Sequence, residues 1–264
     1  PVIYDTMTVF DNLAFPLRAK KVPEAQIKER VLSMAKTLGI ENELDRKPGF
    51  LSGGQRQRVA LGRCLIREAD VFLLDEPISH LDARLKIHMR SELKSICADK
   101  NATVVQVTHD YREAMSLADR MIVLNQGVLM QMGTPQDVYH RPDNEFVAHF
   151  VGDPPMSFID ASLQSSDGRL QFVLEDSEYA IPVADDFDPA PASNARTIRV
   201  GLRANCTTLS HAKDKDHAVP GTIYLIESQG HRRLVSVKLE RAIVRIIVPY
   251  DQDWTIGQPA WLRV

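Results

Sequence analysis

A four-residue apolar run, residues 71–74, leads directly into two acidic residues, Asp75 and Glu76, and so limits the folds open to this chain. The run shows no apolar/polar alternation, which is typical of a strand buried on both faces of a parallel sheet. Residues 103–107 predict a second buried strand, and the apolar residues between the two runs recur at helical spacing. Strand, helix and strand in this order predict an α/β sheet with its ligand site at the carboxyl ends of the strands.

Three amphipathic helices are predicted in the first hundred residues. Residues 23–39 have apolar side chains at helical spacing, with proline near the start and glycine at the end, as helix boundaries prefer. Residues 52–55 match a capping box, a hydroxyl residue followed three positions later by Gln, and predict a helix from there to about Arg67. The apolar positions of the third helix are Leu85, Met89, Leu93 and Ile96.

A second domain is expected beyond residues 152–155, where the helical period disappears and short alternating runs begin. The candidate strands are residues 170–174, 197–202, 219–226, 234–239 and 242–248, separated by turn-rich pieces such as 185–194. Their number and spacing suit an all-β barrel of the oligonucleotide/oligosaccharide-binding (OB) type. We therefore divide the chain into residues 1–152 and 153–264.

Charge and cysteine content exclude several functions. The chain has 32 basic and 35 acidic residues, and from Phe158 onward it has 12 basic and 14 acidic residues with few aromatic side chains. Nucleic acid is therefore a poor ligand. Cys64, Cys97 and Cys206 form no C-x-x-C pair, so neither a disulfide framework nor a zinc site is expected, and a reducing, cytosolic compartment fits best. The apolar runs are far shorter than the ~20 residues of a membrane-spanning helix.

Side-chain-poor residues at a predicted helix start form a candidate anion site. They leave backbone N–H groups, a hydroxyl and the positive end of a helix dipole facing outward, which suits phosphate. The alternative is a loop whose glycines only permit a tight turn. The residues of this candidate site are Ser52, Gly53, Gly54 and Gln55.

The two strand ends supply candidate catalytic groups. Asp75 can hold Mg²⁺ through water, and Glu76 can orient and deprotonate a water that attacks a γ-phosphate. The alternative is an acidic strand end that is simply exposed to solvent. His109 ends the second strand, where its imidazole can hydrogen-bond the same phosphate, although a lone histidine is more often structural.

Four ordered motifs, LSGGQ at 51–55, VFLLDEP at 71–77, SHLD at 79–82 and VTHD at 107–110, resemble the ATP-binding-cassette (ABC) ATPases. The resemblance covers essentially the whole chain. Within this superfamily, the combination looks like the ATPase subunits of carbohydrate importers, of the maltose and glycerol-phosphate type, which carry a C-terminal regulatory β domain. The implied fold is a P-loop NTPase-like ABC nucleotide-binding domain followed by an OB-like regulatory domain.

The resemblance implies a head-to-tail dimer that holds ATP between its subunits. Asp75 would serve Mg²⁺, Glu76 would be the general base, and His109 would contact the γ-phosphate. Asp82 would communicate across the dimer. The residues implied to contact the γ-phosphate of the ATP held mainly by the partner subunit are Ser52, Gly53, Gly54 and Gln55.

The resemblance also implies partners and a location. Residues from about 4 to 50 would form the helical subdomain that receives the permease subunits, with Tyr4, Met7 and Phe10 as candidate contacts. Core packing is the alternative for these three residues. The second ATPase subunit would be either a copy of this chain or a different ATPase chain. A solute-binding protein would be an indirect partner, and the chain would lie at the cytoplasmic face of the cell membrane.

The sequence departs from the family pattern in a few places. None of the 13 glycines is followed by lysine, so the G-x-x-x-x-G-K-[ST] loop that holds the β- and γ-phosphates is absent from these residues. We expect the N-terminal part of the nucleotide-binding domain to be missing and the chain alone to be inactive. His80 stands where relatives more often have Asn, and residues 203–205 read Arg-Ala-Asn where many have Arg-Pro-Glu.

The leading hypothesis is an ATPase that energises import of a carbohydrate, polyol or related solute. Two alternatives stay open: an ATPase of an importer for another solute, such as a polyamine or a metal, and a truncated regulatory protein that keeps the cassette shape without hydrolysing ATP. Nothing in the sequence names the solute.

Overall fold

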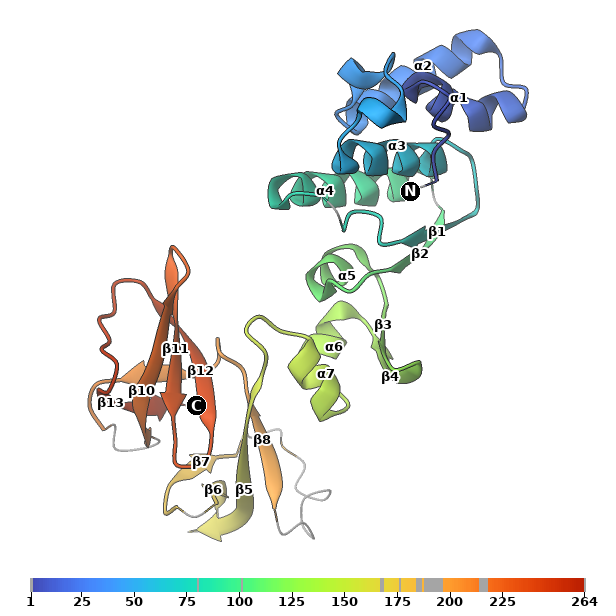
Figure 1. The fold of residues 1–264 in the computed structure, drawn as a ribbon. Helices are drawn as coiled ribbons and strands as arrows, with labels where there is room; N and C mark the ends of the chain where they lie inside the picture. The colour runs from blue at the N-terminus through green and yellow to red at the C-terminus, as the bar shows by residue number, and fades with distance from the viewer. Residues whose placement is uncertain are drawn as a thin grey trace. The chain divides into compact units, whose positions relative to one another are not determined.

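The computed structural model describes residues 2–79, 81–100, 102–166, 169–175, 177–183, 187, 197–213 and 218–263. The chain divides into two compact units, residues 1–121 and 122–264, and Figure 1 labels most of their helices and strands. This division falls earlier than the sequence boundary at residue 152, which stays a prediction. His80, the side chain of Cys97 and nearly all of the turn-rich piece at 185–194 lie outside the described residues.

The first unit opens with helices that share one apolar core. Helix α1 packs against both α2 and α3. The helices predicted at residues 23–39 and from residue 52 are confirmed, with Pro23 as N-cap of α2 and Gly39 in the left-handed region just beyond it, at φ +58°. The helical elements are α1 (Val9–Ala19), α2 (Glu24–Thr37), two short 3₁₀ turns (Glu41–Glu43 and Pro48–Phe50) and α3 (Gly53–Leu65).

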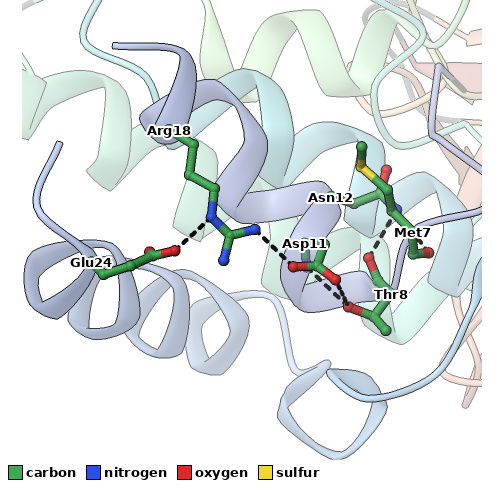
Figure 2. A network of polar contacts seen from close by, with 6 residues as sticks. All are labelled: Met7, Thr8, Asp11, Asn12, Arg18 and Glu24. Carbon is green, nitrogen blue, oxygen red and sulfur yellow. Dashed lines mark hydrogen bonds and ion pairs between the residues drawn. The ribbon is translucent and has the colours of Figure 1, made fainter. Parts of the chain in front are cut away.

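A buried asparagine fixes the segment that precedes α1. Asn12 is fully buried. Its Oδ1 accepts a hydrogen bond from the backbone N–H of Tyr4 at 2.8 Å, and its Nδ2 donates to the carbonyls of Tyr4, Met7 and Thr8 at 3.0, 3.3 and 2.9 Å. Figure 2 shows Asn12 beside Met7 and Thr8 at the start of the helix. Because the amide is fully bonded, its burial costs little and residues 4–8 are held against α1.

A parallel strand–helix–strand unit follows. It consists of β1 (Val71–Asp75), α4 (Ala83–Lys100) and β2 (Thr103–Val107), with Asp75 paired with Val107 in the sheet register. The predicted α/β order and the third helix are confirmed. Helix α5 (Tyr111–Leu117) follows β2 and also belongs to the first unit.

The prediction that β1 and β2 are buried on both faces is wrong. Phe72 and Leu74 lie in the core, but Leu73 on the opposite face is 73% exposed, and Val105 and Val107 of β2 are 52% and 59% exposed. Helices cover one face of this two-stranded sheet. Among the described residues of the first unit, none covers the opposite face. An apolar run indicates that a strand is hydrophobic, but it does not show whether one face or both faces of the strand are covered.

The second unit begins with a hairpin and two short helices. Strands β3 (Met121–Asn125) and β4 (Val128–Gly133) are joined by Gln126 and Gly127, whose φ angles of +48° and +80° suit a two-residue type I′ turn. Helices α6 (Pro135–His140) and α7 (Glu145–Phe150) follow. In the described part of the chain, no helix is long and apolar enough to cross a membrane.

Every described element after α7 is a strand. The strands form a four-stranded antiparallel sheet in the order β7-β6-β5-β8 and a five-stranded antiparallel sheet in the order β12-β11-β10-β13-β9. The two sheets share one apolar core, and the N–H of Ile247 in β12 donates to the carbonyl of Ala204, after β8, at 2.9 Å. The strands are β5 (Ser157–Ser166), β6 (Arg169–Leu174), β7 (Ala180–Pro182), β8 (Ile198–Leu202), β9 (Thr208–Ser210), β10 (Ala218–Ser228), β11 (Arg232–Lys238), β12 (Ile243–Pro249) and β13 (Pro259–Arg263).

The five strands predicted from sequence are confirmed as β6, β8, β10, β11 and β12. Strands β5, β7, β9 and β13 were not predicted. Arg203, which follows β8, ties this part of the chain to the preceding helices, because its guanidinium donates to the carbonyls of Tyr139, Ala148 and Val151 and lies 4.1 Å from the centre of the Tyr139 ring.

Candidate functional site

The start of α3 has the local geometry that the sequence predicts. The hydroxyl of Ser52 accepts from the backbone N–H of Gln55 at 3.2 Å, and Oε1 of Gln55 accepts from the N–H of Ser52 at 2.8 Å. The capping box is therefore confirmed. The Gln55 amide also donates to Oε1 of Glu43 at 3.0 Å, which ties the helix start to the first 3₁₀ turn, Glu41–Glu43.

The capping box leaves donors for an anion at this helix start. The first backbone amides of an α-helix have no intrahelical acceptor, and Gly53 and Gly54 occupy the first two positions of α3. A Cβ placed on Gly53 would meet no atom within 4 Å, so the space beside its Cα is open. The geometry suits a phosphate oxygen, and the role of residues 52–55 in binding nucleotide stays a prediction.

The residue after β1 has a strained backbone. Glu76 has φ +47°, a left-handed value that costs about 1–2 kcal/mol for a residue with a Cβ. Its N–H donates to the carbonyl of Val107 at 2.9 Å. Its own carbonyl accepts from Nε2 of Gln57 at 2.8 Å and from the hydroxyl of Ser79 at 3.1 Å. Backbone strain that surrounding hydrogen bonds hold in place in this way is concentrated at functional sites.

The structure brings Glu76 and His109 into contact at the ends of the two paired strands. Oε1 of Glu76 accepts from the backbone N–H of His109 at 2.9 Å and lies 2.6 Å from Nδ1 of its ring. A carboxylate only accepts, so this contact is a hydrogen bond when Nδ1 carries the ring proton. The His109 side chain is 76% exposed. Oε2 of Glu76 is buried and has no hydrogen-bond partner within the described ranges.

Asp75 and Asp82 lie at exposed positions near this pair in the sequence. Oδ1 of Asp82 accepts from the N–H of Leu85 at 2.9 Å and so caps the start of α4. No group of three His, Cys, Asp or Glu side chains that could hold a metal ion occurs among the described residues. Protein-bound Mg²⁺ often uses one or two carboxylates together with waters and substrate phosphates, so a single exposed carboxylate such as Asp75 fits a shared site.

Sequence reasoning missed Gln57, which holds the loop after β1. Its side chain is 8% exposed, and Nε2 donates to the carbonyls of Glu76 and Pro77, each at 2.8 Å. A signal was available: Gln57 lies four residues before Leu61 and therefore on the buried stripe of α3. A polar residue at such a position generally has a buried partner.

Sequence reasoning also missed Glu113, in α5. Its side chain is 1% exposed, and it accepts hydrogen bonds from Gln106 and Thr108 of the β2 end. Burial raises the pKa of Glu113, whereas the hydrogen bond from Thr108 and the charge of Arg90 lower it. A seven-residue helix shows too little periodicity for the sequence to indicate this burial.

The three candidate permease contacts differ in exposure. Tyr4 is 39% exposed, and its ring lies edge-on to Phe15 at 4.9 Å and beneath the Arg63 guanidinium at 4.3 Å. Met7 and Phe10 are half-buried, and Phe10 packs against the core. Phe10 therefore packs partly into the core, while Tyr4 remains exposed at the surface.

The fold and these contacts define an α/β protein whose acidic and imidazole side chains meet at the ends of parallel strands. A family model described as ABC transporter matches residues 1–79. An sn-glycerol-3-phosphate import ATP-binding protein of Vibrio vulnificus is 43% identical over 267 residues, which cover 99% of this chain and 69% of the relative. A trehalose/maltose import ATP-binding protein of Thermococcus litoralis is 52% identical over 246 residues, 90% of this chain and 64% of the relative. The chain belongs to the ABC transporter ATPases, among the ATP-binding proteins of importers.

Proposed function

We propose that this chain is the ATP-hydrolysing subunit of an importer for a carbohydrate, polyol or related solute. The observation that carries the proposal is the contact of Glu76 with His109 at adjacent strand ends, in a chain that is similar to import ATP-binding proteins for glycerol phosphate and for trehalose/maltose. ABC ATPases bind and hydrolyse ATP, so the remaining question is which residues do so here.

Glu76 is the proposed general base. Its Oε1 is occupied by two bonds from His109, which leaves Oε2 as the oxygen that accepts a proton from water. Oε2 is covered in the present conformation, so the side chain or its loop must move before water reaches it. A positioned carboxylate base contributes about 10²–10⁴-fold to a rate.

His109 is the proposed γ-phosphate contact. A phosphate oxygen only accepts hydrogen bonds, and Nδ1 already donates to Glu76. Nε2 can donate to phosphate at the same time only if both ring nitrogens carry protons. The high exposure of this ring leaves that second nitrogen accessible.

The helix start and the loop after β1 supply the remaining proposed contacts. The amides at the start of α3 would bind the γ-phosphate of the ATP held mainly by a second ATPase subunit. Asp82 would lie at the subunit boundary, and Asp75 would hold Mg²⁺ through water. When bound, that ion neutralises phosphate charge. The residues proposed for the γ-phosphate are Ser52, Gly53, Gly54 and Gln55.

Hydrolysis also needs a phosphate loop. No G-x-x-x-x-G-K-[ST] motif occurs in the 264 residues, and they span 69% of the glycerol-phosphate relative. We therefore propose that the working unit, here called the complete ATPase, contains these residues together with such a loop in an N-terminal segment, and that the 264 residues alone do not hydrolyse ATP.

The proposed partners follow from the same assignment. The complete ATPase would form a dimer and bind permease subunits through the helical region of residues 4–50, with Tyr4 as a contact. It would lie at the cytoplasmic face of the membrane, and a solute-binding protein would be an indirect partner. The strands from β5 to β13 would form the OB-like regulatory domain.

Uptake of labelled solutes tests the proposal. The complete ATPase is reconstituted with its permease subunits in vesicles, and glycerol phosphate, maltose and spermidine are supplied with and without ATP. ATP-dependent uptake of the first or second solute, lost in Glu76→Gln, is the expected result. Uptake of spermidine alone would favour a polyamine importer, and no ATPase activity in the complete protein would favour the non-hydrolysing regulatory alternative.

A further inference from the structure

A buried carboxylate is hydrogen-bonded to the end of β2, next to His109 in the sequence. It belongs to Glu113 of α5, a helix that begins two residues after His109. Glu113 is almost fully buried, at 1% exposure. A buried carboxylate is costly unless its oxygens are bonded, so the groups that bond it show what it holds in place.

Both carboxylate oxygens of Glu113 are bonded to the end of β2. The Gln106 amide donates to Oε1, and the Thr108 hydroxyl donates to Oε2 at 3.2 Å. The same Thr108 oxygen accepts from the backbone N–H of Asp110 at 3.1 Å. His109 lies between Thr108 and Asp110, so these bonds fix the backbone on both sides of the histidine.

Arg90 of α4 connects this cluster to a second helix. Its guanidinium lies 3.2 Å from Oδ2 of Asp110, and Oδ1 of Asp110 accepts from the N–H of Arg112 at 3.0 Å at the start of α5. Burial raises the pKa of Glu113, the Thr108 bond and Arg90 lower it, and the charges of Asp110 and Glu76 raise it. An apolar side chain at this position would avoid that electrostatic cost.

We propose that Glu113 is a positioning residue that, through Thr108, holds His109 where its ring and its backbone amide both reach Glu76. The inference rests on the proposed function, because it assigns the positioned histidine to ATP hydrolysis. Glu113 acts on the reaction through His109 and is not itself a catalytic residue.

The test uses the complete ATPase labelled with ¹⁵N in its histidine rings. Two variants break the link, Glu113→Ala and Thr108→Val. Glu76→Gln gives the reference spectrum for a His109 ring without its carboxylate partner, and His109→Gln assigns the signal by removing it. Glu227→Gln is the matched control, since Glu227 is an exposed glutamate in β10 and its substitution also removes one negative charge.

We expect the Nδ1 signal of His109 to shift toward its Glu76→Gln position in both link variants and to stay at its wild-type position in Glu227→Gln. We also expect kcat to fall about tenfold or more in Glu113→Ala with little change in KM, because a misplacement of 1 Å costs about 10²-fold in rate. Rescue by Glu113→Asp would be partial, since the shorter side chain keeps the charge but not the reach.

An unchanged His109 signal in folded Glu113→Ala overturns the proposal, and so does a fall in kcat without a change in that signal. If Glu113→Ala does not fold, Thr108→Val decides by the same criterion, since it removes only the hydroxyl at nearly constant volume. The spectra need no hydrolysis. A complete ATPase without activity would therefore refute the proposed function, while the His109 signal would still decide whether Glu113 positions the histidine.

Discussion

The start of α3 and the ends of β1 and β2 carry the proposed chemistry, but they are held in different ways. The capping box of Ser52 and Gln55 closes within three residues of sequence. Glu76 is held by Gln57 from 19 residues away and bonds His109 from 33 residues away. The helix start is therefore a local structure, whereas the strand ends depend on the fold of the whole unit.

The two regions also differ in strain and charge. Glu76 has a left-handed backbone and an unbonded, buried carboxylate oxygen, while residues 52–55 have neither a charged side chain nor a positive φ. This difference is consistent with our proposal that the strand ends perform the chemistry and that the helix start binds phosphate. Substitutions at the strand ends should consequently have larger effects than substitutions at the helix start.

The largest effect is expected for Glu76→Gln in the complete ATPase. The amide keeps the size of the side chain but cannot accept a proton from water, so we expect kcat to fall by about 10²–10⁴-fold. Steady-state phosphate release measures this effect. Glu227→Gln is the control and should hydrolyse ATP at the wild-type rate; near-normal turnover of Glu76→Gln would remove Glu76 from the role of base.

The second effect is a loss of stability in Gln57→Leu. The substitution leaves the carbonyls of Glu76 and Pro77 without their common donor, and we expect the free energy of unfolding to fall by about 1–3 kcal/mol. Urea denaturation measures the change. Gln26→Leu alters an exposed position of α2 and should change stability by less than about 0.5 kcal/mol. Equal effects of the two variants would contradict the long-range support of Glu76.

A smaller effect is expected for Ser52→Ala. The substitution removes the hydroxyl that caps α3, which typically costs about 1 kcal/mol. The exposed Ser91 inside α4 has no capping role in the structure, so Ser91→Ala should leave the free energy of unfolding nearly unchanged. A larger loss of stability in Ser52→Ala than in Gln57→Leu would contradict the conclusion that the helix start is a local structure and that the strand ends depend on the fold of the whole unit.

The smallest effect on the free energy of unfolding is expected at an exposed ion pair, and the other variants can be compared with it. Arg18 lies between Asp11 and Glu24 (Figure 2), and hydrogen bonds from Arg18 and then Thr8 hold the pKa of Asp11 below its ordinary value. A lowered pKa stabilises the fold above the pKa of the unfolded state, and this contribution is lost as the pH falls.

Arg18→Gln should therefore reduce the free energy of unfolding at pH 7 by less than about 0.5 kcal/mol, because both side chains are about 40% exposed and solvent screens the pair. Urea denaturation at several pH values measures the difference between the variant and the wild type. The difference should shrink on acidification. A difference that grew as the pH fell would have the wrong sign for a carboxylate with a lowered pKa.

The same contrast explains how much could be predicted from the sequence. The Ser52 capping box and the five strands β6, β8, β10, β11 and β12 were predictable because caps and alternation are local patterns. The pairing of Glu76 with His109 was partly predictable, since parallel strands end at one edge of a sheet. The exposure of Leu73 and the φ angle of Glu76 were not, because each depends on residues distant in the sequence. The burial of Glu113 was not predictable either, because a seven-residue helix shows too little periodicity.

A nucleotide site shared by two subunits is tested by the molecular mass of the complete ATPase carrying Glu76→Gln, measured by light scattering with and without Mg²⁺ and ATP. If the strand ends hydrolyse the ATP that the helix start of a second subunit binds, this variant should remain an ATP-dependent dimer, and the added substitution Ser52→Ala should weaken that dimer. A monomer in the presence of ATP, or a dimer that forms equally without ATP, would contradict a nucleotide site shared by these two regions.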